Sequence, residues 1–360
     1  MQASGTQNAS CRWPENCPGV LLVGAGVVGR AIAEAHLIRG IDFCLADRDE
    51  AAIVSAKQWL ARLGIATLEV DFPLEDLSVI AVGESCSSGS GDLVIESILE
   101  DVNAKRQLFA ELQRALGVEV LLCSNTSTLL ISDIAEGDLE APEQIVGLHF
   151  FMPVTARAAA EVVAGERSAA AAVDLATQHA KRLGKQPVRC KDGPGFIVNR
   201  ILSPYLNQAL LLLCRGATES QIERAAVAYG MPISPLELID WIGIATMYHA
   251  GKAYWLAFPD RISPSPLVPA LLKRKRLGRA SGAGLYDYEG GMRSTSLSPV
   301  SRFSNFQPLA RISSILSVRS SPSMMPIERS LCPSSVATFA TAAAPAGGLA
   351  PPPLVISLTP

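Results

Sequence analysis

Two short stretches of this sequence contain candidate functional residues. The first is a glycine-rich turn that follows a short apolar run and opens a stretch with helical spacing; its residues are Gly24, Ala25, Gly26, Val27, Val28 and Gly29. The second is His149, which follows the apolar run 145–148. A turn of the first kind is typical of a phosphate-binding loop, and the histidine could accept a proton.

The glycine-rich turn predicts a dinucleotide site because strand, turn, helix and acid occur in the required order. Gly24 is expected to make the tight turn, Gly26 to let the backbone approach a pyrophosphate, and Gly29 to let helix and strand pack closely. The next apolar run ends at Asp47, which is expected to accept hydrogen bonds from the adenosine ribose. Its charge repels a 2′-phosphate, so NAD is favoured over NADP, and the adjacent Arg48 is interpreted as a solvated surface residue. A glycine turn without a ligand is the alternative.

His149 is the candidate base for a hydride transfer, which needs a proton acceptor, a group that orients it and polar groups for the substrate oxygen. At the carboxyl end of a strand in a doubly wound sheet, it would lie at the ligand-binding edge. On the residues alone, a core histidine with only structural contacts is the more frequent outcome. The four histidines are far apart in sequence and no CxxC pair occurs, so no metal site is predicted.

Alternating strand-like and helical stretches predict an α/β fold for residues 19–190. The strand-like runs are 20–23, 41–46, 93–95, 120–122, 145–150 and 162–163, and the helical stretches between them include 31–38, 102–116 and 169–183. This alternation predicts parallel strands with crossover helices, a doubly wound sheet of the Rossmann type. Residues 191–290 have apolar residues at helical spacing instead, and Pro204 is expected to interrupt and kink the first helix. They are predicted to form a separate all-helical domain.

The last stretch, 291–360, has a different composition. It is rich in Ser, Pro, Ala and Arg, lacks lysine and carries a single acid, Glu328. Such a segment cannot readily bury a core, so disorder is predicted. The abrupt change also raises the hypothesis of translation out of frame, which resequencing of the gene past the codon for Gly290 would test.

Composition favours a soluble, reduced, cytoplasmic protein. The 360 residues carry a formal net charge of −3, which gives no hint of a nucleic-acid or membrane partner. Residues 1–18 lack a signal-peptide pattern, and no apolar run reaches the ~20 residues that cross a bilayer. The eight cysteines are scattered, and several lie in apolar runs, where buried thiols are usual.

Several blocks of the sequence resemble the signature blocks of the 3-hydroxyacyl-CoA dehydrogenase family. The blocks are SNTS at 124–127, GLHFFMPV at 147–154, KDGPGFIVNR at 191–200, PLELID at 235–240 and SGAGLYDY at 281–288. They occur in the family's order between about Gly19 and Tyr288. The resemblance implies the same two-domain fold, NAD as cofactor, an acyl-CoA substrate and a homodimer formed through the helical domain.

The resemblance also implies roles for individual residues. The family's catalytic histidine corresponds to His149, and its partner glutamate corresponds to Glu161, which would fix the tautomer and raise the basicity of the ring. Ser127 corresponds to the serine that touches nicotinamide and substrate oxygen, and Asn199 to the asparagine that contacts the substrate. The alternatives are a solvated carboxylate, a turn or helix-cap serine and a helix-surface amide, respectively.

Glu100 and Lys105 correspond to a further pair on the cofactor side. From the residues alone they would be charges of the first turn of a helix. The implied reaction is oxidation of an L-3-hydroxyacyl-CoA to the 3-ketoacyl-CoA, with hydride passing to NAD while His149 removes the hydroxyl proton. This would place the chain in fatty-acid β-oxidation or in the reverse, butanoate-type metabolism.

The sequence departs from the family pattern at several points. Met152 stands where the family has asparagine, Ala280 where it has lysine, and Ser234 where it has glycine. The segment 47–92 is shorter than the family's, which usually carries a helical hairpin that contacts CoA; Lys57 is not assigned a role there. The loss of two polar contacts at about 1 kcal/mol each would weaken NAD binding roughly ten- to a hundredfold.

Two other functions compete with the leading one. A related NAD-dependent dehydrogenase of a small hydroxy acid or sugar acid would explain the shortened segment. A non-catalytic NAD-binding protein is the alternative from another class, and the joint presence of the four candidate residues His149, Glu161, Ser127 and Asn199 argues against it. The hydratase half of bifunctional relatives is expected to be missing because few residues precede Val20.

Overall fold

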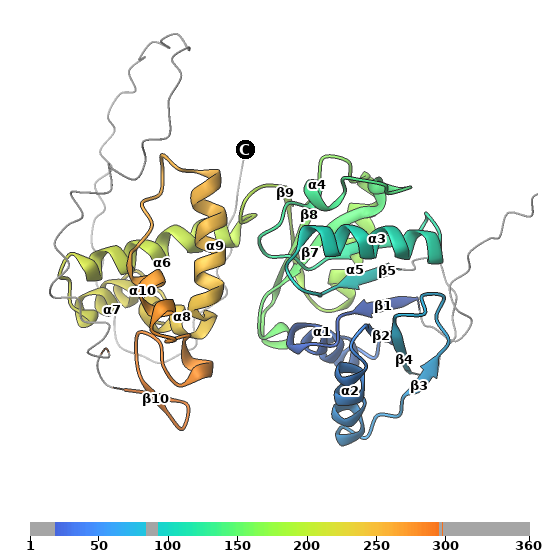
Figure 1. Cartoon of the computed structure of the whole chain (residues 1–360), viewed down its shortest axis with the longest axis horizontal. Coiled ribbons are helices and arrows are strands. Elements are labelled where there is room, and N and C mark those ends of the chain that lie inside the picture. The colour runs from blue at the N-terminus through green and yellow to red at the C-terminus, as the bar shows by residue number, and fades with distance from the viewer. Residues whose placement is uncertain (1–18, 84–92, 295–296, 298–360) are drawn as a thin grey trace, which may run out of the picture. The chain divides into compact units, whose positions relative to one another are not determined.

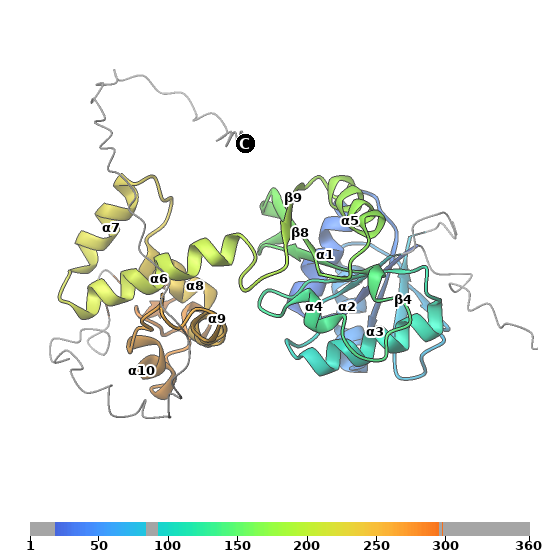
Figure 2. The same cartoon turned by 90° about the horizontal axis from the view of Figure 1, so that it is seen from above.

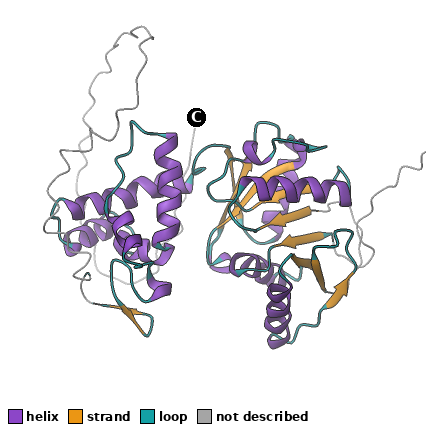
Figure 3. Ribbon diagram, viewed as in Figure 1, coloured by secondary structure: helices purple, strands orange, loops and turns teal. Residues whose placement is uncertain are grey.

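The computed structural model describes residues 19–83, 93–294 and 297. Its first part is a nine-stranded sheet with helices, and its second part is helical (Figure 1). Figure 3 shows the same division by secondary structure. The predicted fold class, a Rossmann-type sheet followed by a helical region, is confirmed. The predictions for segment 291–360 fall almost entirely outside the described residues.

The sheet is mixed rather than fully parallel. Its spatial order is β3-β4-β2-β1-β5-β6-β7-β8-β9. The five central strands run parallel, and they are β1 (Val20–Val23), β2 (Phe43–Asp47), β5 (Leu93–Glu96), β6 (Leu121–Ser124) and β7 (Ile145–Phe150). The strands outside them are β3 (Leu68–Val70), β4 (Ser78–Val82), β8 (Ala159–Ala164) and β9 (Gln186–Lys191). β4 is antiparallel to β2 and β8 is antiparallel to β7, so the expectation of parallel strands is wrong at both sides of the sheet.

Helices cover both faces of this sheet (Figure 2). On one face lie α1 (Val27–Ile38), α2 (Glu50–Arg62) and α5 (Ala170–Arg182), and on the other lie α3 (Val102–Leu116) and α4 (Ile131–Ile134). The strands supply both layers because successive side chains point to opposite faces. In β1, Val20 and Leu22 pack into the first layer, while Leu21 and Val23 pack into the second. The apolar runs that predicted strands are therefore strands buried on both faces.

The described part of the shortened segment contains one helix and two strands. α2 begins after Asp49, whose side chain accepts a hydrogen bond from the Ala51 N–H, and it is followed by β3 and β4. Lys57 lies on α2 and forms an ion pair with Glu69 at 2.5 Å. No helical hairpin occurs in 48–83, in agreement with the departure noted from the sequence.

The helical part begins after β9. Its helices are α6 (Val198–Cys214), α7 (Glu219–Ala228), α8 (Pro235–Ile242), α9 (Ile244–Ala257) and α10 (Leu267–Lys273), followed by the two short strands β10 (Tyr288–Glu289) and β11 (Met292–Arg293). Their core includes Leu210, Ile239 and Leu271, each fully buried. Pro204 lies within α6, which continues as one helix to Cys214. The expectation that Pro204 interrupts this helix is therefore wrong. Short 3-10 turns lie at η1 (Pro142–Gln144), η2 (Val154–Ala156) and η3 (Arg279–Ser281).

The described cysteines differ in state. Cys123, Cys190 and Cys214 are free thiols, whereas Cys44 in β2 is disulfide-bonded. The expectation that the cysteines stay reduced is therefore wrong for Cys44, and the remaining four lie outside the described residues. No helix in the described part of the chain is long and apolar enough to span a membrane.

Candidate active site

His149 and Glu161 form a buried pair across two antiparallel strands. In the register of β7 and β8 the two residues lie directly opposite each other, which places their side chains on the same face of the sheet. His149 Nδ1 lies 2.8 Å from Glu161 Oε2, and the two residues are 6% and 1% exposed. The strand register, and not their separation along the chain, brings them together.

The second oxygen of Glu161 is bound as well. Its Oε1 accepts hydrogen bonds from the N–H groups of Ile197 at 2.9 Å and Val198 at 2.8 Å, at the start of α6. Burial raises the pKa of the Glu161 carboxyl, but the bonds from His149 and from the two N–H groups outweigh it and hold the pKa below its usual value. Glu161 is therefore a carboxylate that can accept a hydrogen bond from Nδ1–H of His149, and this tautomer leaves Nε2 to accept a proton.

Aromatic rings surround the imidazole. The ring centroids of Phe151 and Phe196 lie 4.7 and 5.9 Å from that of His149. Phe196 has a φ of +46° in the loop between β9 and α6, so this loop carries it in a left-handed backbone conformation. Among the described residues His149 Nε2 makes no hydrogen bond, so it is the nitrogen that remains for a substrate hydroxyl.

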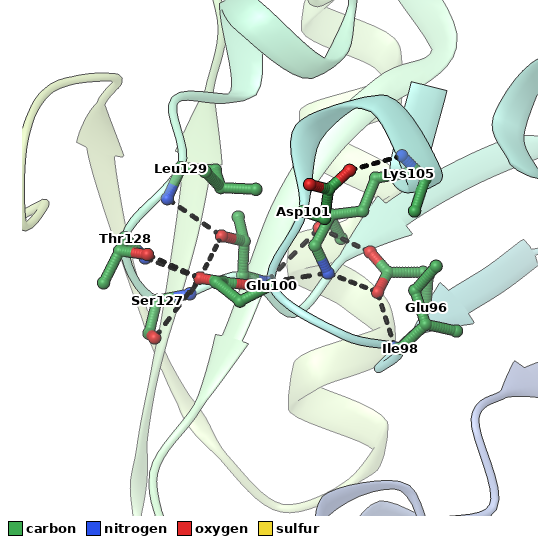
Figure 4. A network of polar contacts seen from close by, with 11 residues as sticks. Glu96, Ile98, Glu100, Asp101, Lys105, Ser127, Thr128 and Leu129 are labelled. Atoms are coloured by element: carbon green, nitrogen blue, oxygen red, sulfur yellow. Dashed lines mark hydrogen bonds and ion pairs between the residues drawn. The ribbon is translucent and has the colours of Figure 1, made fainter. Parts of the chain in front are cut away.

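Glu100 organises the loop after β6 (Figure 4). Its Oε1 accepts hydrogen bonds from the N–H groups of Ser127 and Thr128, both at 3.0 Å, and from the hydroxyl of Thr126 at 2.7 Å. The hydroxyls of Ser127 and Thr128 lie 3.5 and 2.8 Å from the same oxygen. Burial raises the pKa of Glu100, but Lys105 and these hydroxyls outweigh it, and the pKa lies below its usual value. Glu100 lies outside α3, whose cap is Asp101, so it is not the first-turn charge of the alternative interpretation.

Lys105 is a buried cation between two carboxylates. It is 1% exposed, and its Nζ lies 2.5 Å from Glu96 Oε1 and 3.5 Å from Glu100 Oε2 (Figure 4). Glu96 also accepts hydrogen bonds from the Ser124 hydroxyl and the Ile98 N–H, both at 2.7 Å. Burial raises the pKa of Glu96, although all three donors favour its charged form. The three side chains tie the end of β5 to α3 and to the Ser127 loop.

Asn199 and Ser127 are in direct contact, although they are far apart in the sequence. Asn199 Nδ2 donates to the Ser127 carbonyl oxygen at 3.2 Å. The neighbouring Asn125 Oδ1 accepts the Phe150 N–H at 2.8 Å and so ties the end of β6 to the end of β7. Ser127 follows β6, and His149 lies next to the last residue of the adjacent parallel strand β7, so both are at the same edge of the sheet.

The glycine-rich turn has the backbone that its pattern predicts. Gly24 has a φ of +104°, and a Cβ there would lie 2.7 Å from the Ser97 carbonyl oxygen. A Cβ on Gly29 would lie 1.7 Å from the Gly24 carbonyl oxygen, so the helix can start here only with glycine. A Cβ on Gly26 would meet nothing within 4 Å, because this position faces open space. The first turn of α1 has no side-chain cap and no acid, which leaves its N–H groups for an anion.

Asp47 lies beside this turn at the end of β2. Its Oδ2 accepts the Ala25 N–H at 2.7 Å and its Oδ1 accepts the Asp49 N–H at 2.9 Å. Each carboxylate oxygen can accept a further hydrogen bond, so a ribose hydroxyl can still bind. Arg48 forms ion pairs with Asp76, at 2.7 Å, and with Glu111. This agrees with its interpretation as a surface residue rather than a ligand for a 2′-phosphate.

Comparison of the chain with known proteins identifies its family. The family model described as "3-hydroxyacyl-CoA dehydrogenase, NAD binding domain" matches residues 19–193, and the one described as "3-hydroxyacyl-CoA dehydrogenase, C-terminal domain" matches residues 195–288. The chain belongs to the 3-hydroxyacyl-CoA dehydrogenase family. The members of this family are NAD-dependent oxidoreductases, and NAD is the cofactor of the domain that residues 19–193 form.

Relatives of this chain are found among larger proteins. The fatty acid oxidation complex subunit alpha of Pseudomonas savastanoi pv. phaseolicola is 35% identical over 276 residues, which cover 74% of this chain and 38% of that protein. The chain thus spans about two fifths of the length of the curated relatives it matches. The same subunit of Psychrobacter cryohalolentis is 33% identical over 282 residues, again 74% of this chain and 38% of the relative.

Solved structures agree in fold. 3-Hydroxybutyryl-CoA dehydrogenase from Escherichia coli K12 matches with a TM-score of 0.62 and 31% identity, covering 76% of this chain and 60% of that one. (S)-3-Hydroxybutyryl-CoA dehydrogenase PaaH1 from Ralstonia eutropha matches with a TM-score of 0.60 and 27% identity, covering 75% of this chain and 98% of that one.

The last two of the family's sequence blocks, 235–240 and 281–288, are joined around Asp240. Its Oδ1 accepts the Leu285 N–H at 2.7 Å, and its Oδ2 accepts the Tyr286 N–H at 2.9 Å. A Cβ on Gly284 would lie 2.1 Å from the Asp240 carboxylate, so this position requires glycine. The two blocks therefore have a structural role, since they join the end of α8 to the segment that precedes β10.

Two of the departures from the family pattern lie on the surface. The Met152 side chain, which replaces an amide, is 44% exposed, and Ala280 is exposed in η3. Among the described residues no cluster of three or more potential metal ligands occurs.

The sequence did not single out Glu96, Asn125 or the N–H groups of Ile197 and Val198. Glu96 had a readable signal, because it is an acid that directly follows the apolar run 93–95. The two N–H groups had none, since any residue provides them.

Proposed function

We propose that this chain oxidises L-3-hydroxyacyl-CoA to 3-ketoacyl-CoA with NAD, and that His149 is the base. The observation that carries the proposal is the buried His149–Glu161 pair, with Nδ1 held by the carboxylate and Nε2 left for the substrate. The same site serves either direction of the reaction, since a base for the alcohol is, once protonated, an acid for the ketone.

His149 acts on the hydroxyl at C3 of the substrate. Nε2 accepts the hydroxyl proton while the Glu161 carboxylate stabilises the imidazolium that forms. The Ser127 hydroxyl and the Asn199 amide are the proposed contacts of the substrate oxygen and acyl group. Asn199 Nδ2 also donates to the backbone carbonyl oxygen of Ser127 at 3.2 Å, which holds the two residues side by side. The two phenyl rings beside the imidazole exclude water from the reacting atoms.

The residues of the sheet domain fit NAD. The open position at Gly26 and the uncapped first turn of α1 suit a pyrophosphate, and Asp47 suits the adenosine ribose. Glu100 and Lys105 are proposed to lie on the nicotinamide side, because both hold the Ser127 loop. When it is bound, NAD supplies the hydride acceptor.

The substrate class is tested by comparing a CoA thioester with free acids. Purified full-length chain should oxidise NADH in the presence of acetoacetyl-CoA, as followed by the absorbance of NADH. Acetoacetate and small free keto acids should support at most about a hundredth of that kcat/KM, because the CoA moiety contributes binding energy. NADPH should be used poorly, because of Asp47.

Turnover of free hydroxy or keto acids alone would overturn the CoA assignment and favour the related dehydrogenase of a small hydroxy acid. NADH binding, measured by its fluorescence, with no turnover of either class would favour a non-catalytic NAD-binding protein.

We also propose that the chain forms a homodimer through its helical region and works in the cytoplasm. Large apolar side chains are exposed there on α6, α8 and α9, including Ile201 at 69%, Trp241 at 53% and Leu256 at 63%. Sedimentation analysis at micromolar concentration should give a dimer, and Ile201→Glu should shift it toward monomer. A wild-type monomer would contradict the proposal.

A further inference from the structure

A cavity of about 270 Å³ lies between α6, α9 and α10 of the helical region. It is larger than the cavity of about 150 Å³ that admits a benzene molecule in a protein core. Its lining includes Leu210 on α6, Met247 and Trp255 on α9, and Val268 on α10. No residue of the proposed catalytic set lines it.

The cavity lies along the face of α6 that also carries Asn199. Asn199, Ser203, Asn207 and Leu210 are spaced four, four and three residues apart, so their side chains share a face of the helix. The last three line the cavity. A smaller cavity, of about 20 Å³, is lined by Asn199 and also by Ser203 and Tyr254, which both cavities share. From Ser203 to Leu210 the helix rises about 10 Å.

Two polar residues of the lining, Asn207 and Tyr254, form hydrogen bonds within the chain. Asn207 Nδ2 donates to the Ser263 carbonyl oxygen, and its Oδ1 accepts the Ser265 N–H, both at 2.9 Å. The Tyr254 hydroxyl donates to the Arg200 carbonyl oxygen at 2.9 Å. Asn207 and Tyr254 therefore present their apolar parts to the cavity, next to Leu210 and Val268. An apolar ligand suits this part of the lining, whereas Lys252, which also lines the cavity, is exposed to solvent.

We propose that this cavity binds the distal methylene groups of the acyl chain, so that the chain acts on thioesters longer than four carbons. The inference rests on the proposed function and deepens it. The acyl group would pass Asn199 and Ser203 and then lie against Leu210, Trp255 and Val268. Each methylene group that leaves water there increases affinity about fourfold.

Gly251 on α9 offers a way to fill the cavity. It lines the cavity, has a helical backbone, and a Cβ added to it would meet nothing within 4 Å. Gly251→Leu therefore places a side chain in open space, and leucine favours the helix. Gly251→Ala is the matched control, because it adds only one carbon. Thermal unfolding of both variants checks that they fold.

The measured quantity is the ratio of kcat/KM for 3-ketodecanoyl-CoA to that for acetoacetyl-CoA. The wild-type ratio should be about ten or more, from several buried methylenes. Gly251→Leu should lower it about tenfold, and Gly251→Ala less than about twofold. A wild-type ratio near one, or equal losses on both substrates in Gly251→Leu, would overturn the proposal. So would a Gly251→Leu variant that changes from dimer to monomer, since a second copy would then occupy the cavity.

A binding measurement separates this inference from the proposed function. Trp255 lines the cavity, so decanoyl-CoA should change the indole emission, whereas acetyl-CoA should not. Trp255→Phe and Gly251→Leu should each remove the response. A response without turnover would support the cavity and contradict the proposed reaction. Turnover with no response and no preference for chain length would support the reaction and contradict the cavity.

Discussion

The sheet domain contains two buried pairs of side chains that include a histidine. In one pair the histidine faces a carboxylate, and in the other it faces a second histidine. His149 faces the carboxylate of Glu161 at 2.8 Å. His36 on α1 faces His179 on α5, with their Nε2 atoms 3.0 Å apart, and His36 Nδ1 lies 2.8 Å from the Ile32 carbonyl oxygen. His36 is fully buried, and His179 is 3% exposed.

The comparison shows that burial alone does not make a histidine a base. Burial lowers the pKa of His36 to about 4, with Arg182 adding to the effect, and it lowers the pKa of His179 well below its usual value. Both rings are therefore neutral packing groups at neutral pH. Glu161 gives His149 what that pair lacks, a negative charge that stabilises the protonated ring.

Replacement of the proposed base should have the largest effect. His149→Gln should lower kcat about 10³-fold or more, since general base catalysis contributes about 10²- to 10⁴-fold. NAD affinity, measured by fluorescence titration, should change little. If His36→Leu combined with His179→Leu lowers kcat as much, the distinction between the two pairs is wrong.

Removal of the charge at Glu161 should have the next largest effect. Glu161→Gln should lower kcat about 10²-fold, because an amide can donate to Nδ1 and so stabilise the tautomer whose Nε2 is already protonated. KM should change less, since one amide oxygen can still accept the N–H groups at the start of α6. An unchanged kcat would mean that His149 does not need a charged partner.

Acid should destabilise the protein through the other histidine pair. Because the folded pKa values lie below that of an unfolded histidine, about 6.5, the unfolded state binds more protons as the pH falls below it. The contribution of His36 to the free energy of unfolding is fully present above about pH 6.5. It decreases by about 1.4 kcal/mol per pH unit as the pH falls toward 4. Urea unfolding between pH 7 and pH 4 should show a shallower decrease for His36→Leu combined with His179→Leu. Equal slopes would contradict this.

Ser127→Ala should have the smallest effect. The hydroxyl is one of several donors to Glu100, and at 3.5 Å it is the most distant of them. We expect kcat/KM for acetoacetyl-CoA to fall about tenfold through the loss of one hydrogen bond to the substrate oxygen. Thr128→Ala is the matched control from the same loop, and its kcat/KM should change less than that of Ser127→Ala. The reverse order would move the substrate contact to Thr128.

The elements that carry the site were largely readable from the sequence. The bounds of β1, β7 and α3 agree with the predicted runs, because buried strands and an amphipathic helix leave strong patterns. Three strands, β3, β4 and β9, were missed. β3 and β9 are partly or largely exposed, so they lack the apolar run that marks a buried strand.

The site itself was readable only in part. The glycine turn and Asp47 follow from local sequence, whereas the partner of His149 depended on the resemblance. Antiparallel register decides which residue faces His149, and no pattern within 145–164 states it. The convergence of hydrogen bonds on Glu100 was likewise hidden, since it joins residues from two loops. The catalytic and cofactor roles of these residues stay predictions until the variants are measured.

The carboxylate of Glu161 forms hydrogen bonds with the proposed base and with the start of α6. One oxygen holds the imidazole, and the other holds the first amides of the helix that carries Asn199. If that helix shifts away from β8, the carboxylate must either follow it or lose two hydrogen bonds. A displacement on the substrate side is therefore transmitted directly to the proton acceptor, without any intervening residue.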